Sequence, residues 1–167
     1  MVNAEIQTPP NNRPSAVVDM RPDTLVRIAL LGLGTGAIAW ALAMGLDKFI
    51  IGPVFCPTTG VVHSCASYSD VIAGNIVLIL SGLGAMVGLV RLGAYRPMLV
   101  AIAVVATLWN LNAWLSAVLW YEALGWSALI YMVAYVAYAW LVRPRNFIVV
   151  VAMLAVFIGL VRYISTL

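Results

Sequence analysis

Two cysteines, Cys56 and Cys65, are the side chains of this sequence best suited to covalent chemistry. Both lie in one segment, residues 47–70, between two long apolar runs. In an oxidising compartment such a pair normally forms a disulfide, and closing so short a loop restricts the unfolded chain by about 2 to 3 kcal/mol on the entropic model. The pair also suits electron exchange with a partner thiol if one sulfur is accessible as a thiolate. The sequence therefore predicts either a structural staple or a redox-active disulfide.

A metal site is the third interpretation of this segment, with Cys56, His63 and Cys65 as ligands and Asp70 as a fourth. The spacing lacks the paired CxxC blocks of typical zinc sites, so we expect no bound metal. His63 is the only histidine in the chain, which excludes a bis-histidine haem held by this chain alone. The sequence also contains no nucleophile triad, phosphate-binding loop or pair of catalytic carboxylates.

The surroundings of the cysteine segment are strongly apolar. Hydrophobic residues make up 64% of the 167 residues and charged residues only 9%, which lies outside the range of soluble domains. Five stretches are each long enough to cross about 30 Å of hydrocarbon as a helix; they cover residues 25–46, 71–90, 98–121, 126–142 and 147–164. These runs do not alternate as membrane strands do, so their backbones must bond internally as helices. We therefore predict an all-α fold, a polytopic transmembrane bundle of about five helices.

The basic residues are distributed unevenly between the ends of these predicted helices. Seven of the nine lie at three alternate boundaries, and two lie at the others. The seven are Arg13, Arg21, Arg27, Arg91, Arg96, Arg143 and Arg145, and the two are Lys48 and Arg162. By the positive-inside rule we expect a plasma or inner membrane protein with a cytoplasmic amino terminus and an extracytoplasmic loop 47–70. That side is oxidising, which favours a disulfide between the two cysteines.

The two ends of the chain differ in character. Residues 1–24 contain Pro9, Pro10, Pro14 and Pro22 and show no periodic apolar face, so we expect a disordered cytoplasmic tail. Residues 25–167 then form one transmembrane domain. Its last helix carries Arg162, so the alternative is that this helix lies at the membrane interface and does not cross the membrane. The net charge of +3 comes from residues that stand singly or in pairs, unlike the clustered basic face of a nucleic-acid-binding protein. We expect the bilayer and other membrane proteins as partners, and no nucleic acid.

Glycines recur at helical spacing in the first two apolar runs. Gly32 with Gly36, and Gly84 with Gly88, are i, i+4 pairs that predict faces approached closely by another helix backbone. Such small-residue seams occur throughout membrane bundles, so they indicate packing rather than a particular function.

Polar and aromatic side chains also recur within the apolar runs. Asn75, Asn110 and Asn112 predict hydrogen bonds between helices, because an unpaired amide is costly there. Contact with a quinone-type head group is the alternative. Tyr131, Tyr135 and Tyr138 follow helical spacing and predict a packed stripe.

Residues 56–74, CPTTGVVHSCASYSDVIAG, resemble the first extracytoplasmic loop of the vitamin K epoxide reductase family. That loop has two cysteines several residues apart, a short serine-containing segment and a glycine that opens the second helix. Here Cys56, Cys65, Ser67, Ser69 and Gly74 fill those places. The family also has an inside amino terminus, and the resemblance extends over about residues 25–142. It implies a four-helix core and, as a cofactor, a quinone.

The family's activity also depends on a CxxC pair at the outward end of the fourth helix. The corresponding place is Gly125-Trp126-Ser127-Ala128, which has no sulfur. The resemblance therefore implies a degenerate quinone-linked thiol–disulfide oxidoreductase. In it, Cys65 exchanges electrons inward, Cys56 meets a partner thiol protein, and another protein completes the system. The alternative is a non-catalytic structural subunit or assembly factor of a larger membrane complex.

Overall fold

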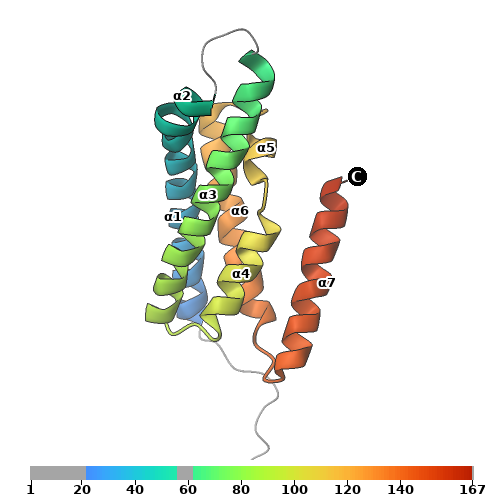
Figure 1. Ribbon diagram of the computed structural model, residues 1–167. Coiled ribbons are helices and arrows are strands. Elements are labelled where there is room, and N and C mark those ends of the chain that lie inside the picture. The colour runs from blue at the N-terminus through green and yellow to red at the C-terminus, as the bar shows by residue number, and fades with distance from the viewer. Residues whose placement is uncertain (1–21, 56–61, 167) are drawn as a thin grey trace, which may run out of the picture.

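Helices account for most of the described chain (Figure 1). The computed structural model describes residues 22–166 apart from 56–61, with side chains described for 22–54 and 68–163. The elements are α1 (Pro22–Leu46), the π-helical turn η1 (Asp47–Ile51), α2 (Gly52–Phe55), α3 (Val62–Arg91), α4 (Pro97–Thr107), α5 (Leu111–Leu115), α6 (Trp120–Leu141) and α7 (Phe147–Thr166). No strand occurs within these described ranges, so the all-α prediction is confirmed for them.

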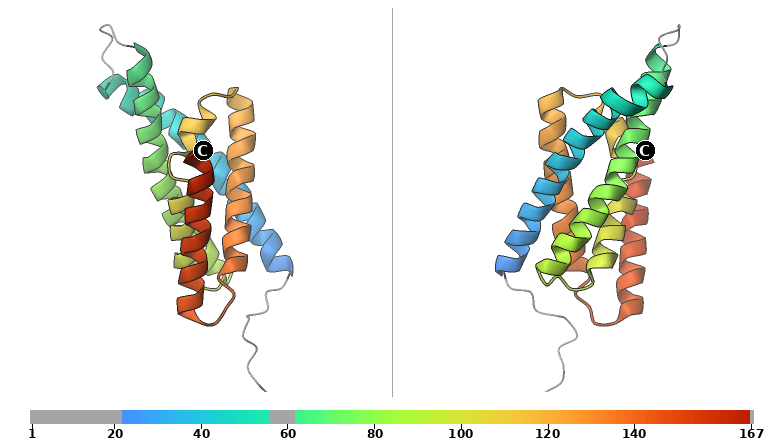
Figure 2. Two further views of the ribbon diagram at one scale, coloured as in Figure 1. Left: turned by 90° about the vertical axis from the view of Figure 1, so that its right-hand side faces the viewer. Right: turned by 60° about the vertical axis from the view of Figure 1, so that its left-hand side comes forward.

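Four helical columns form the bundle: α1, α3, α4 with its continuation α5, and α6. α1 packs against α3 and α6, and α4 also packs against α3 and α6, which closes a ring. α7 lies beside α4 and α6 on the outside of this ring (Figure 2). Tyr135 and Tyr138 are 0% exposed in the core and Tyr131 is 4% exposed, which confirms the predicted tyrosine stripe.

The closest helix contact is between α1 and α6. A Cβ atom at Gly36 would lie 2.7 Å from the Ser127 carbonyl oxygen and 2.8 Å from Ala128 Cα. A Cβ atom at Gly32 would lie 2.9 Å from Met132 Cα. Ser127 also donates a buried hydrogen bond from Oγ to the Gly36 carbonyl oxygen, at 3.0 Å. The glycine face predicted on the first helix is therefore confirmed, and it lies against α6.

The second predicted glycine pair behaves differently. A Cβ atom at Gly84 would meet no atom of the described chain within 4 Å, whereas one at Gly88 would meet the Leu31 side chain. The prediction of a close backbone contact is therefore wrong for both glycines. Gly84 lies on a face of α3 that no neighbouring helix covers within the described ranges.

The third apolar stretch, expected as one helix over 98–121, is divided into α4 and α5. Asn110 lies between them in the left-handed conformation, with φ of 67°, which asparagine tolerates better than most residues. Just before it, the Thr107 hydroxyl donates to the Ala103 carbonyl oxygen (2.8 Å) and contacts the Tyr138 hydroxyl. Back-bonding of this kind bends helices. The prediction of a continuous helix is therefore wrong.

Asn75 of α3 satisfies the backbone at this break. The backbone N–H of Asn110 donates to Asn75 Oδ1 (3.1 Å), and the side-chain Nδ2 of Asn75 donates to Asn110 Oδ1 (3.0 Å). Irregular backbone at membrane depth requires such partners, because lipid offers none. The predicted hydrogen bonding between helices is confirmed for these two asparagines.

Two helices begin earlier than the apolar runs predict. α3 begins at Val62 and α6 begins at Trp120, whereas the runs were expected to start at 71 and 126. Together with η1 and α2, this makes the expected loop 47–70 helical at both ends, and residues 56–61 lie outside the described chain. Polar residues such as Ser69 and Glu122 lower the mean hydropathy of a segment, so the predicted apolar run starts after them. They do not interrupt the helix itself.

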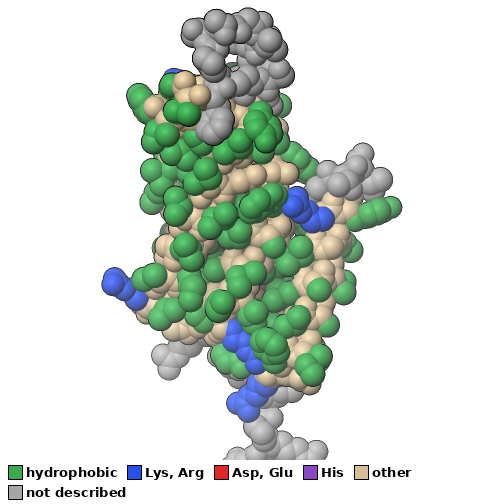
Figure 3. Space-filling model, in the orientation of Figure 1, with side chains coloured by type: hydrophobic (Ala, Val, Ile, Leu, Met, Phe, Trp, Pro, Cys, Tyr) green, Lys and Arg blue, Asp and Glu red, His purple; other side chains and the backbone are tan. Residues whose placement is uncertain are grey.

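Three of the five helices expected to cross a membrane have the length and surface of membrane-crossing segments within the described ranges. Three segments are long and apolar enough to span a membrane: Pro22–Val54, Tyr68–Arg91 and Trp120–Leu141. Pro97–Thr107 and Phe147–Tyr163 are apolar but shorter. Large hydrophobic side chains are exposed on every long helix, and Figure 3 shows them spread over one face, with a few basic side chains at the end where α7 begins and single ones elsewhere. A surface of this kind suits hydrocarbon better than water.

Replacement of Gly36 by leucine tests the α1–α6 contact. Because the side chain would meet α6 backbone, we expect Gly36→Leu to lower the free energy of unfolding by about 1 to 3 kcal/mol. Gly84→Leu is the matched control and should change it by no more than about 0.5 kcal/mol. Thermal unfolding of the detergent-solubilised protein, followed by tryptophan fluorescence, measures both. Equal losses in the two variants would contradict the importance of this contact.

Candidate functional site

A cavity of about 300 Å³ lies at the end of the bundle where α1 meets η1 and α6 begins. We call it the end cavity. Its polar and aromatic lining includes Trp40, Asp47, Lys48, Asp70, Asn112 and Trp120. These residues come from α1, η1, α3, α5 and α6, so the bundle, rather than any local motif, brings them together.

Two tryptophans from different helices form one wall of the end cavity. The rings of Trp40 and Trp120 stack with centroids 6.5 Å apart and planes inclined by 28°. Trp120 also meets Tyr121 edge to face at 5.8 Å. Stacked rings offer a flat, apolar surface on which another planar ring can pack.

The end cavity also carries two carboxylates and one cation. Asp70 is half-buried, interacts with the Asn112 side chain by a hydrogen bond and lies close enough to Asp47 to feel its charge. The Oδ1 atom of Asp47 is buried and has no hydrogen-bond partner within the described part of the chain. Lys48 adds one positive charge to the same lining. A buried acceptor without a partner favours a ligand that donates a hydrogen bond.

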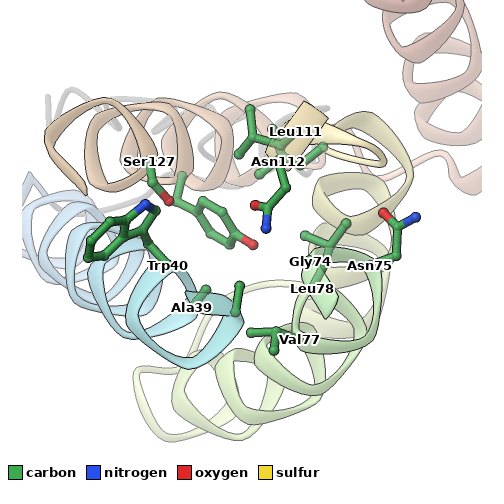
Figure 4. A pocket seen from close by; sticks show the side chains of 12 residues that line it. Ala39, Trp40, Gly74, Asn75, Val77, Leu78, Leu111, Asn112 and Ser127 are labelled. Carbon is green, nitrogen blue, oxygen red and sulfur yellow. The ribbon is translucent and has the colours of Figure 1, made fainter. Parts of the chain in front are cut away.

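A second, water-sized cavity of about 10 Å³ shares Trp40 and Asn112 with the end cavity. Figure 4 shows the Asn112 amide pointing into it, near Gly74 of α3. A Cβ atom at Gly74 would overlap the Asn112 amide and lie 2.7 Å from Asn112 Cβ, so glycine is what leaves space for this side chain. Asn112 therefore connects the interior of the bundle with the end cavity.

In the sequence, both cysteines lie between Lys48 and Asp70, two residues of the end cavity. Cys65 belongs to the first turns of α3, about one and a half turns and roughly 8 Å along the helix axis before Asp70. Its side chain is not among those described, and Cys56 lies outside the described residues altogether. Their bonding as a disulfide therefore stays a prediction.

Residues 125–128, the place where the resemblance suggested by the sequence would require a second cysteine pair, take part in helix packing. Of residues 125–128, Ser127 and Ala128 are buried against Gly36 of α1, whereas Gly125 and Trp126 are exposed. A reactive pair at this level of α6 would have to displace the tightest contact of the bundle. The absence of sulfur here agrees with the structural role of these residues.

Several lining residues were not singled out by the sequence. Asp47 had no predicted role, Lys48 served only in the charge count, and Trp40 was expected only among the tryptophans of the membrane interface. Asp70 was considered as a metal ligand, together with Cys56, His63 and Cys65, whose side chains lie outside the described set. Among the described residues, no group of three metal-binding side chains is placed to hold an ion. The sequence offered one indication that Trp40 belongs to this site. It follows Gly36 by four residues and therefore lies on the face of α1 that packs against another helix.

Comparisons with known proteins return nothing similar to this chain. No family model, no curated protein and no solved structure matches it.

A double-mutant cycle tests the fit of Asn112 against Gly74. We expect Gly74→Ala to destabilise the protein by about 1 to 3 kcal/mol, because the added methyl group overlaps the amide. In the Asn112→Ala background the same change should cost clearly less, because the amide is gone and only the contact with the Cβ atom of residue 112 remains. Gly45→Ala, which has open space around it, is the control. Thermal unfolding measures all four variants, and equal costs in both backgrounds would disprove the contact.

Proposed function

We propose that this chain is an integral membrane protein that binds the ring of a quinone or quinol in the end cavity. The observation that supports this is the pairing of a stacked Trp40–Trp120 wall with hydrogen-bonding groups in one cavity. A planar ring packs against such a wall. The Asn112 amide can donate to a ring oxygen, and Asp47 Oδ1 can accept from a ring hydroxyl.

Cys56 and Cys65 are the proposed electron donors. Oxidation of the two thiols breaks two S–H bonds, forms one S–S bond and releases two electrons and two protons. A quinone supplies the two-electron acceptor and becomes the quinol, so the step balances. A partner thiol protein then reduces the disulfide by exchange. The position of Cys65 near the start of α3, shortly before the cavity residue Asp70, supports this direction of transfer.

This proposal makes the chain a degenerate relative of the vitamin K epoxide reductases. In that family a second cysteine pair reacts with the quinone, and here the corresponding residues pack α6 against α1. Electrons would therefore pass between the loop sulfurs and the ring without an intermediate pair.

We also propose a cytoplasmic amino terminus. Arg27, Arg91, Arg96 and Arg145 lie near helix ends on the side where α1 begins and α7 begins, and Arg96 Nη2 donates to the Arg145 carbonyl oxygen at 2.9 Å. Basic residues of this kind favour the cytoplasmic side. The end cavity and the cysteines would then face the oxidising side.

Labelling with a membrane-impermeant thiol reagent tests this orientation. After mild reduction, Cys56 and Cys65 should react in intact cells. In a variant that lacks both native cysteines, Arg145→Cys should react only after the membrane is permeabilised. Reaction of Arg145→Cys in intact cells would reverse the proposed orientation.

Quinone-dependent reoxidation of the reduced protein tests the activity. We expect free thiols to disappear as an equal amount of quinol forms, measured by thiol titration and quinone absorbance. Trp120→Leu should slow this reaction about fivefold through loss of the ring wall. Trp126→Leu is the matched control, because Trp126 is also an exposed tryptophan of α6 but does not line the end cavity. If the thiols reoxidise no faster with quinone than without it, the proposed enzyme function is wrong.

The second candidate is a non-catalytic subunit or assembly factor of a membrane complex. It is favoured by one observation, the close packing of Ser127 and Ala128 against α1 at a place where the proposed resemblance would require a reactive pair. Purification in a gentle detergent should then recover stoichiometric partner subunits. A chain that migrates alone at monomer size would count against this function.

A further inference from the structure

A cavity of about 320 Å³ lies on the side of the bundle, where the break between α4 and α5 meets α7. We call it the side pocket. Its polar and aromatic lining includes Trp109, Asn110, Trp114 and Arg162. None of these residues lines the end cavity, so the two cavities are separate sites.

Arg162 is the charged group of the side pocket. One of its N–H groups, on Nη1, donates to the Trp109 carbonyl oxygen at 3.0 Å, at the point where the helix is interrupted. A guanidinium has five N–H donors, so most of its donors remain available. No carboxylate within the described ranges forms an ion pair with it. The side pocket therefore has a positive charge without a described counter-charge.

Arg162 lies partway along the bundle, at a depth where a charge without a described counter-charge is unfavourable. α4 has 11 residues and is about 17 Å long, so the break at its end lies well inside a hydrocarbon layer of about 30 Å. Figure 1 shows that α7 ends at about the height of α5 along the bundle, short of the end of α3 where that helix begins. A cation at such depth is costly and draws lipid head groups or other anions toward itself.

An apolar groove of about 430 Å³ adjoins the side pocket. It runs between α3 and α4, is lined by residues such as Leu83, Met86 and Ile102, and shares Trp109 with the side pocket. Ile102 is 54% exposed, so the groove is open to the surroundings of the protein. A cationic pocket and an apolar groove on the two sides of one tryptophan match an amphiphile with an anionic head and a hydrocarbon chain.

We propose that the side pocket binds an acidic, phosphate-bearing lipid. The head group pairs with Arg162 in the side pocket, and an acyl chain lies in the groove beyond Trp109. Guanidinium and phosphate form charge-assisted, often bidentate hydrogen bonds, which a zwitterionic head group offers less readily because its own cation competes. This site requires the membrane location but is independent of the quinone activity and of both cysteines.

Lipid-dependent stabilisation of the purified full-length protein tests the proposal. In a neutral detergent, phosphatidylglycerol should raise the melting temperature more than phosphatidylcholine with the same acyl chains, and native mass spectrometry should show it retained. Arg162→Gln should lower the apparent affinity for phosphatidylglycerol about tenfold. Arg162→Lys should keep part of it. Arg91→Gln, at an exposed arginine near the other end of the bundle, should leave it unchanged.

A second variant covers the case in which Arg162→Gln does not fold. Ala106→Phe narrows the groove and keeps the cation, and it should weaken long-chain phosphatidylglycerol binding while the protein retains its melting temperature without lipid. Equal stabilisation by the two lipids, or an unchanged preference in both variants, would overturn the site. Equal stabilisation by inorganic phosphate would show that the side pocket binds a free anion and not a lipid. Quinone reoxidation is measured separately, so either proposal can fail alone.

Discussion

The rest of the structure depends on the contact between α1 and α6. Gly32 and Gly36 leave no room for a side chain between the two backbones, and Ser127 adds a hydrogen bond across them. Trp40 follows Gly36 by four residues and Trp120 precedes Ser127 by seven, so both tryptophans continue the same two faces. The close contact therefore ends in an aromatic pair, and beyond it the helices enclose the end cavity.

The break between α4 and α5 is the second feature on which both cavities depend. It brings Asn112 against Gly74 and into the lining of the end cavity, and it places Trp109 and Asn110 in the lining of the side pocket. A break of this kind is stable in an apolar environment only when its backbone groups find partners. Asn75 and Arg162 are those partners, one on each side of the column.

The tight α1–α6 packing also bears on the chemistry of the chain. At residues 125–128, where the proposed resemblance would require a second cysteine pair, Ser127 and Ala128 hold the two helices together. A position cannot easily be both a close backbone contact and an accessible redox centre, because a reactive sulfur needs space for its partner. Any redox chemistry of this chain would thus depend on Cys56 and Cys65.

The sequence by itself determined that the described chain is helical and suited to a membrane, because hydrocarbon leaves an apolar backbone no partner but itself. It also indicated the Gly32–Gly36 contact and the buried tyrosines through their spacing. The same spacing was misleading at Gly84, because spacing defines a helix face but not what packs against it. The break near Asn110 depends on Asn75, and the end cavity joins residues as distant as Asp47 and Asn112. Only the tertiary structure decided these features, because each arises from contacts between helices that no local pattern encodes.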